Sequence, residues 1–199
     1  MELLIATSNR GKVREIEELL SATAVRFRSL LDFPGVIEVE ETGSTFEENA
    51  ILKAVGYALQ TGLWALADDS GLEIAALGNA PGVLSARYGG DGTGFDQKMS
   101  MLLGEMELAH DHRRDARFVC SMALANPDGD IAIKAEGVCE GKIADEPRGN
   151  GGFGYDPMFI PARHEKTFGQ LSNDIKREIS HRALASRIII RYLHAFTAV

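Results

Sequence analysis

The stretch ATSNRGKVRE, Ala6 to Glu15, follows the apolar run Leu3–Ile5 and precedes a segment with helical spacing. In Lys12–Leu20, apolar residues recur every three or four positions with charged residues between them, which predicts an amphipathic helix. A strand, a tight turn ending in Gly-Lys and a helix form the context of a P-loop. However, Ala6 replaces the first glycine of that motif, and Val13 replaces the hydroxyl residue that reaches magnesium. The stretch predicts an opening strand and helix, but not a standard P-loop.

Size and composition predict a single domain over residues 1–199. The chain has 45% hydrophobic residues, which is enough to bury a full core. Its 25% of charged residues gives no indication of disorder. A net charge of −8 argues against a non-specific nucleic-acid or membrane binder, but allows a small phosphorylated ligand. Cys120 and Cys139 lack metal-site spacing and are expected to be buried thiols. With no signal peptide or membrane span in the pattern, we expect a soluble, cytoplasmic protein.

Strands and helices are mixed along the chain without strict alternation, which predicts an α/β fold with a mixed sheet. Ser44-Thr45-Phe46-Glu47 has the form of a capping box that opens a helix to about Gln60. A buried strand, Leu63–Ala67, is expected to stop at Asp68–Gly71, with Leu72–Leu77 extended beyond it. The remaining expected elements are strands at 116–125 and 130–139 around the turn 126–129, and helices at 96–106 and from near 180.

Two predicted helix starts carry cations where the helix dipole disfavours them. Ser8 or Asn9 can cap the first helix, yet Lys12 lies in its first turn. His181 and Arg182 hold the same place in the last helix, and Lys176 lies just upstream. A bound anion or carbonyl group would remove the conflict at either start. The alternative is that these are ordinary solvated side chains.

Acidic pairs suggest a magnesium site. Asp68 and Asp69 are adjacent at the end of a strand, so their side chains should point to opposite faces and serve different roles. Together with Glu40-Glu41, they offer the hard oxygen ligands that Mg²⁺ uses when it also binds substrate phosphates. Ordinary turn chemistry is the alternative for the aspartates. Lys53, at the border of an apolar helix stripe, could reach a phosphate or could be a surface lysine.

A glycine-rich segment from residue 148 to 157 carries two aromatic residues. Phe153 and Tyr155 stand among Gly149, Gly151, Gly152 and Gly154. A loop of this kind can close over a flat ring and stack on it. The alternative is that its aromatic residues fill the core.

In combination, these segments resemble the inosine/xanthosine triphosphatase family, the pyrophosphatases of noncanonical purine nucleoside triphosphates. The resemblance runs from residue 6 to residue 185 and covers nearly the whole chain. Asn79 and Leu84 depart from the family pattern, which commonly has glycine and an aromatic residue at these places. The matching stretches are ATSNRGKVRE, EETGSTFEENAILKA, ALADDSGLEIAALGNAPGVLSARY, ARFVCSMAL, EPRGNGGFGYDPMF, KTFGQLS and SHRALA.

The resemblance implies an enzyme that cleaves ITP, dITP or XTP between the α and β phosphates, with Mg²⁺, to monophosphate and pyrophosphate. It implies an elongated α/β domain with a long mixed sheet, two lobes and a central cleft, and a homodimer. Asp69 matches the catalytic base and, with Glu40, the metal ligands. The substrate contacts it implies are Thr7, Ser8, Asn9, Arg10, Gly11, Lys12, Ser70, Phe153, Gly154, Tyr155, Asp156, Lys176, His181 and Arg182, to which Lys53 is added as a phosphate ligand.

Base selection is expected to follow the pattern of donors and acceptors. The 6-oxo group of hypoxanthine or xanthine can accept from Arg182 or His181, whereas the 6-amino group of adenine would leave a buried donor unpaired. The exclusion of guanine must involve its 2-amino group. Two alternatives stay open: a pyrophosphatase for other modified or standard nucleotides, and a nucleotide sensor without catalysis. The presence of both Asp69 and Glu40 argues against the sensor.

Overall fold

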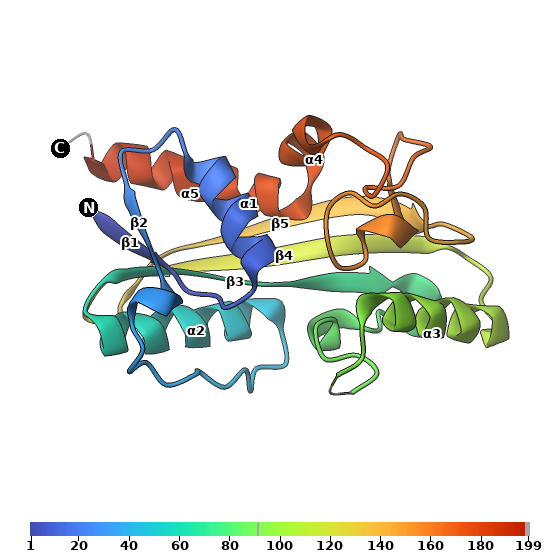
Figure 1. Ribbon diagram of the computed structural model, residues 1–199, viewed down its shortest axis with the longest axis horizontal. Helices are drawn as coiled ribbons and strands as arrows, with labels where there is room; N and C mark the ends of the chain where they lie inside the picture. Colours follow the sequence, from blue (N-terminus) through green and yellow to red (C-terminus); the bar gives the residue numbers. More distant parts are fainter. Residues whose placement is uncertain (91, 198–199) are drawn as a thin grey trace. The chain divides into compact units, whose positions relative to one another are not determined.

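Within residues 1–90 and 92–197, six strands form one mixed sheet in the order β2-β1-β3-β4-β5-β6 (Figure 1). The computed structural model describes residues 1–90 and 92–197. Strand β1 pairs in parallel with β2 and β3, whereas β5 and β6 pair antiparallel, so the predicted α/β fold with a mixed sheet is confirmed. The strands are β1 (Glu2–Ile5), β2 (Arg26–Ser29), β3 (Trp64–Ile74), β4 (Asp115–Ala125), β5 (Ile131–Ile143) and β6 (Phe159–Pro161). The helices are α1 (Arg10–Leu20), α2 (Phe46–Thr61), α3 (Phe95–Leu108), α4 (Asn173–Ile179) and α5 (His181–Thr197).

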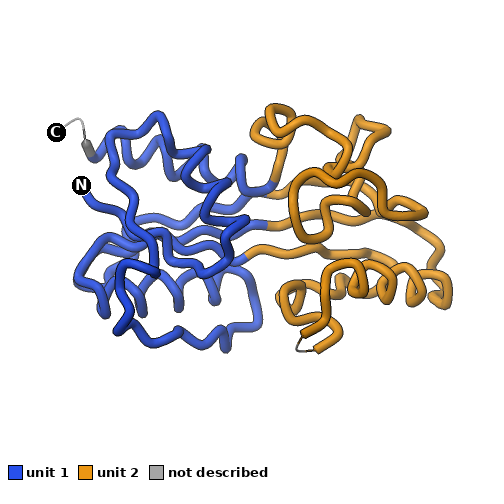
Figure 2. The backbone as a smooth tube through the Cα atoms, viewed as in Figure 1, with its two compact units in different colours: residues 1–69, 120–137, 181–199 blue, residues 70–119, 138–180 orange. Residues whose placement is uncertain are grey.

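The chain divides into two compact units (Figure 2). Unit 1 comprises residues 1–69, 120–137 and 181–199, and unit 2 comprises residues 70–119 and 138–180. Each of the three long strands, β3, β4 and β5, begins in one unit and ends in the other. The two units agree with the two lobes expected from the sequence, and the cleft expected with them stays a prediction.

In unit 1, α1 and α5 cover one face of the sheet and α2 covers the other (Figure 1). Side chains alternate along each strand, so Leu3 and Ile5 join the core under α1 and α5, whereas Leu4 joins the core under α2. The α2 face is built almost entirely from alanines of the helix and the strands. These small side chains let α2 lie close to the sheet: they are Ala50, Ala54, Ala58, Ala65, Ala67, Ala123 and Ala125.

Unit 2 has its own core, which contains a group of aromatic rings. Phe118, Phe159 and Phe168 form a cluster in which ring centroids lie 4.6 to 6.3 Å apart. Helix α3 adds Met99, Leu102 and Met106 to the same core. Within the described residues of both units, no helix is both long and apolar enough to cross a membrane.

The structure corrects two local predictions. The capping box lies one residue later than expected, because Thr45 accepts the Glu48 N–H and Glu48 accepts from the backbone of Thr45. Strand β3 does not stop at Asp68–Gly71 but runs through it to Ile74. Both aspartates find polar partners on the neighbouring helices, so the chain can stay extended there. The strand β2, the strand β6 and the short helix α4 had no clear sequence signal.

Candidate active site

The two aspartates of β3 face opposite sides of the sheet, as their adjacency predicted. Leu66 points toward α1 and α5, and Ala67 toward α2. By the same alternation, Asp68 lies on the α1 and α5 side and Asp69 on the α2 side. Both residues are buried: Asp68 has no exposed surface, and Asp69 is 6% exposed. Each face of the strand thus presents one carboxylate to a different set of partners.

Helix α2 supplies the partners of Asp69. Asn49 donates to one oxygen of Asp69 at 3.1 Å, and the Lys53 ammonium lies 3.5 Å from the other. Asn49 and Lys53 are one helical turn apart, which places both on the face of α2 that meets β3. Lys53 also contacts the carboxylate of Glu41, so its ammonium bridges two acids. Burial raises the pKa of Asp69 above its ordinary value, and Glu41 acts in the same direction while Lys53 opposes it.

Of the two predicted glutamates, the structure brings Glu41 to this cluster. Glu40 is exposed and makes no hydrogen bond or ion pair within residues 1–90 and 92–197. In those same ranges, no three acidic, histidine or cysteine side chains gather closely enough to enclose a metal ion. The acids near Asp69 therefore offer a partial set of oxygen ligands rather than a closed cage.

Helices α1 and α5 supply the partners of Asp68. The Lys12 ammonium lies 3.3 Å from its Oδ2 atom. Arg182 donates to the same atom from Nη2 at 3.0 Å and from Nε at 3.3 Å, and its Nη1 lies 2.5 Å from a Glu15 oxygen. Burial alone would raise the pKa of Asp68, but the charges of Lys12 and Arg182 outweigh it and hold the pKa below its ordinary value. Asp68 is thus kept as an anion between two cations.

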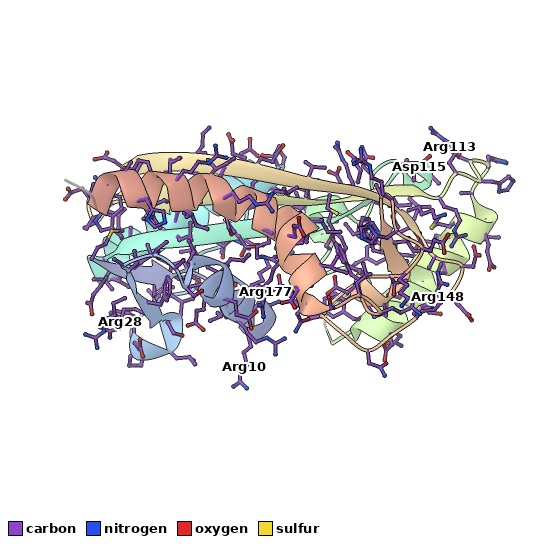
Figure 3. All side chains as sticks on the ribbon, turned by 90° about the horizontal axis from the view of Figure 1, so that it is seen from above. Arg10, Arg28, Arg113, Asp115, Arg148 and Arg177 are labelled. Carbon is purple, nitrogen blue, oxygen red and sulfur yellow. The ribbon has the colours of Figure 1, made fainter. Side chains whose placement is uncertain are left out.

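The loop before α1 is organised by Asn9, one of the two expected caps. Its side-chain oxygen accepts from Gly11 N at 2.9 Å and from Lys12 N at 3.2 Å, and its own N–H donates to Thr7 Oγ1. Ser8 is exposed. Arg10 is exposed too, and its side chain extends outward from the start of α1 (Figure 3). Of the predicted loop residues, only Lys12 reaches the buried carboxylates of β3.

The predicted residues of the glycine-rich segment form their own cluster in unit 2. Asp156 accepts the Phe153 N–H at 2.7 Å and the Lys176 ammonium at 2.5 Å, and that ammonium lies 4.9 Å from the centre of the Phe153 ring. Tyr155, in contrast, is 3% exposed and donates to Ser85 O, so it fills the core. A side chain at Gly152 would collide with Asp156, because an added Cβ would lie 1.9 Å from its Oδ2.

The other predicted contacts adjoin these clusters along the chain. Ser70 is half-buried where β3 enters unit 2, and Gly154 is half-buried in the segment before β6. His181 is 5% exposed at the first position of α5. Two residues escaped the sequence reasoning. Glu15 follows Lys12 by three residues on α1, and this spacing indicates that the two side chains share a face of the helix. The close approach of Gly137 to α5 could have been suspected only because a glycine lies inside a strand.

The comparisons with known proteins agree over nearly the whole chain. A model of the Ham1 family matches residues 3–192. A dITP/XTP pyrophosphatase from Nostoc sp. is 48% identical over 184 residues, which cover 92% of this chain and 89% of that protein. A second dITP/XTP pyrophosphatase, from Desulforamulus reducens, is 46% identical over 194 residues, or 98% of this chain and 96% of that one.

Solved structures give the same result at the level of the fold. A HAM1 protein from Coxiella burnetii matches with a TM-score of 0.91 and 45% identity, covering 98% of this chain and 99% of that one. A nucleoside-triphosphatase or dITP/XTP pyrophosphatase from Mycobacterium abscessus matches with a TM-score of 0.77 and 40% identity, over 95% and 98% of the two chains. The family resemblance predicted from the sequence is thereby confirmed, and the chain belongs to the Ham1 family.

Proposed function

We propose that this chain is a pyrophosphohydrolase of noncanonical purine nucleoside triphosphates, which cleaves dITP, ITP or XTP to the monophosphate and pyrophosphate. The observation that carries the proposal is the arrangement on β3. Two buried carboxylates stand back to back, and each faces a lysine, Lys12 on one side and Lys53 on the other. The dITP/XTP pyrophosphatases that resemble this chain support the substrate class. The reaction removes such nucleotides from the pool available for synthesis of nucleic acids.

The chemistry needs positive charge before anything else, because a triphosphate carries about four negative charges and its hydrolysis depends on positioning and electrostatic stabilisation. Lys12, at the start of α1, and Lys53, on α2, are the cations that we assign to the phosphates. Thr7, Ser8 and Asn9 form the rest of the loop that would receive them, and Arg10 and Gly11 complete it. These assignments extend the family pattern to the positions of this chain.

Asp69 is the residue that we assign as general base. It is buried enough for its pKa to lie above the ordinary value, which brings it nearer to the pH at which a base works well. Asn49 holds one of its oxygens through a hydrogen bond of 3.1 Å, and this fixes the direction of the carboxylate. In this role Asp69 orients a water molecule in line with the leaving pyrophosphate and takes its proton.

The acids of this side also fit Mg²⁺ if substrate phosphates complete its shell. Magnesium commonly binds through one or two carboxylates together with phosphate oxygens. Asp69 and the Glu40–Glu41 segment provide such a set, and Glu41 is the glutamate whose carboxylate lies beside Lys53. When bound there, the ion would neutralise phosphate charge and polarise the phosphorus under attack.

Further features complete the proposal. From the family pattern we also assign substrate contacts to Ser70, Phe153, Gly154, Asp156 and Lys176, and a contact with the base to His181. We assign the reaction to the whole of residues 1–199 as one catalytic domain. We place the enzyme in the cytoplasm as a homodimer with small-molecule substrates.

One experiment tests the reaction directly. The purified chain is given a panel of nucleoside triphosphates, with and without Mg²⁺, while pyrophosphate and orthophosphate are measured separately. Pyrophosphate from ITP, dITP and XTP, at rates well above those for ATP and GTP and only with the metal ion, is the expected result. Release of orthophosphate, or equal rates for all bases, would refute the proposal.

The role of Asp69 has its own test. Replacing it, Asp69→Asn, keeps an oxygen that can accept from Asn49 and should leave the fold intact. Turnover of ITP should fall by at least about a hundredfold, the low end for the loss of a general base. Asp128→Asn, an exposed residue in the β4–β5 turn, is the matched control and should behave as the native chain. Near-native hydrolysis by the Asp69 variant would remove the assignment.

A further inference from the structure

Residues 37–43, just before α2, form no helix or strand of their own. The segment instead runs alongside α2 within unit 1, in the direction opposite to the helix (Figure 1). Ile37 lies beside Gln60, in the last turn of α2, and Gly43 lies beside Asn49, in its first turn. The placement of every side chain in the segment therefore depends on how α2 holds it.

Alternate residues of segment 37–43 face α2, as they would in a strand. Two residues of extended chain span about 6.6 Å, and one turn of an α-helix spans about 5.4 Å, so successive helix-facing residues can meet successive turns. Glu41 is on the helix-facing side and contacts Lys53, whereas the adjacent Glu40 is exposed. The half-buried residues are Val39, Glu41 and Gly43, and the exposed residues next to them are Glu38, Glu40 and Thr42.

Two side chains near the end of α2 hold the beginning of the segment. The Gln60 amide pairs with both backbone groups of Ile37: Ile37 N donates to Gln60 Oε1 at 2.8 Å, and Gln60 Nε2 donates to Ile37 O at 3.0 Å. The Tyr57 hydroxyl accepts the Val39 N–H at 3.3 Å. These polar side chains take the place of the neighbouring strand that the backbone groups of an extended segment would otherwise need.

Asn49 holds the other end of the segment and also the proposed general base. The residue is completely buried. Its side-chain oxygen accepts the Gly43 N–H at 2.8 Å, and its side-chain nitrogen donates to Asp69 at 3.1 Å. Beside these bonds, the Lys53 ammonium contacts both Glu41 and Asp69. One face of α2 thus holds together two acids that come from different segments of the chain.

The fit between the segment and α2 is close at Gly56. A Cβ added at this position would lie 2.6 Å from Cγ2 and 3.2 Å from Cγ1 of Val39. The valine therefore occupies the space that a side chain of the helix would fill. A slip of the segment by one residue would remove Val39 from this space and turn Glu41 to the exposed side. Packing and hydrogen bonds thus specify the same register.

We propose that Tyr57 and Gln60 are positioning residues for the acidic side of the active site. They fix the register of segment 37–43 along α2, and this register keeps Glu41 beside Asp69. The inference rests on the proposed function, in which these acids bind Mg²⁺ and the substrate phosphates. Both positioning residues follow the acidic cluster on α2, Gln60 by about 10 Å along the helix axis, so they act through the segment and not by contact with the reacting atoms.

The first test loosens the far end of the segment by combining Tyr57→Phe with Gln60→Ala. This variant keeps the buried ring and a good helix former at the exposed position. Hydrogen exchange at the amides of residues 37–43, followed by mass spectrometry, should become faster by about tenfold or more because their acceptors are lost. The Mg²⁺ concentration for half-maximal ITP hydrolysis should rise by about tenfold, the low end for losing groups that orient metal ligands. Gln97→Ala, which replaces an exposed glutamine on α3, is the matched control and should leave both values unchanged.

A second pair of variants changes the register without removing a hydrogen bond. Gly56→Ala favours the helix, but its Cβ displaces Val39, so it should raise the Mg²⁺ requirement in the same way. Adding Val39→Ala removes both Cγ atoms that the new Cβ would meet, and this double variant should return to the native Mg²⁺ requirement. Such a rescue is expected only if the position of the segment determines the requirement.

Three results would overturn the proposal. Faster exchange in residues 37–43 with a native Mg²⁺ requirement would do so, since a merely structural contact predicts that combination. Native exchange rates in the variant without the Tyr57 hydroxyl and the Gln60 amide would show that these groups do not hold the segment. Failure of Val39→Ala to rescue Gly56→Ala would show that the register is not what matters.

A further measurement separates this inference from the proposed function. Titration calorimetry with inorganic tripolyphosphate, at increasing Mg²⁺ concentrations, reports on the same acids without turnover. If the native chain releases no pyrophosphate from ITP, the proposed function fails, and the positioning role is judged by whether the variants need about tenfold more Mg²⁺ to bind tripolyphosphate. If the native chain is active and the variants keep its Mg²⁺ requirement, only the positioning role fails. A native chain with neither activity nor Mg²⁺-dependent binding would overturn both.

Discussion

Replacing Gly137 with alanine should push the start of α5 away from the sheet. Gly137 lies on β5 in unit 1, directly beneath the first turns of α5. A Cβ added at this position would lie 2.1 Å from His181 O and 2.5 Å from Ala185 N. Both neighbours are backbone atoms of a helix, so no side chain can rotate to make room. Real Cβ atoms stay at least 3.0 Å from such atoms, so the helix must retreat by about 0.9 Å.

The magnitude follows from that displacement. Overpacking a well-packed core costs about 1–3 kcal/mol, and two backbone contacts this short place the expected cost near 3 kcal/mol. For a chain of this length each kcal/mol lowers the melting temperature by about 2–4 °C, so we expect a loss of about 6–12 °C. The first residues of α5 are His181 and Arg182. A shift of about 1 Å in groups that position a substrate can lower the rate by about a hundredfold.

The assay combines calorimetric melting with ITP hydrolysis at a temperature well below the melting transition, where the variant is folded. The matched control is Gly104→Ala, in the middle of α3, where an added Cβ meets nothing within 4 Å. Alanine is a better helix former than glycine, so this control should stabilise the chain by about 0.5–1 kcal/mol. A Gly137→Ala variant that melts at or above the native temperature, or hydrolyses ITP at the native rate, would refute the reasoning.

Two further predictions concern the thiols and the glycine-rich segment. Burial raises the pKa of Cys120 and of Cys139 to about 12, so at pH 8 only about one thiol in ten thousand is ionised. Ellman's reagent should therefore detect no thiol in the native chain and two in denaturant. Fast labelling of the native chain would contradict this prediction. Gly152→Ala should displace Asp156, because the added Cβ would lie 1.9 Å from its Oδ2 and the backbone at Gly152 has a φ of +70°. Steady-state kinetics should then show a KM for ITP that is raised by about tenfold. An unchanged KM would argue against a role in substrate binding for the cluster of Phe153, Asp156 and Lys176.

Local patterns predicted the features that depend on near neighbours in the chain. The alternation of a strand was enough to place Asp68 and Asp69 on opposite faces, and capping preferences narrowed the start of α1 to Ser8 or Asn9, of which the structure shows Asn9. The helical spacing of Asn49 and Lys53 placed them on one face of α2. Each of these features is decided within one or two turns of backbone, where sequence spacing and spatial distance correspond.

The partners across the sheet were beyond sequence reasoning because chain topology decides them. Asp68 and Arg182 are 114 positions apart, and nothing in either neighbourhood points to the other. The cations of the last helix start therefore suggested a ligand, although Arg182 is satisfied by protein carboxylates. For the same reason, the sequence could not show which of Glu40 and Glu41 contacts Lys53. The path of the loop decides this, and it brings Glu41 to the lysine.

The different surroundings of the two aspartates explain how one dipeptide can serve two functions. Asp68 is fully buried with two cations within 3.3 Å, and their charges hold its pKa below the ordinary value, which favours the ionised form. Asp69 has one cation at 3.5 Å, an amide and a nearby glutamate, and its pKa is raised. A permanent anion suits an anchor, because its partners never lose it, whereas a carboxylate whose pKa lies nearer to neutral can accept a proton and release it again. The Asp-Asp pair within β3 thus combines one carboxylate that two cations hold as an anion with one whose raised pKa suits proton transfer.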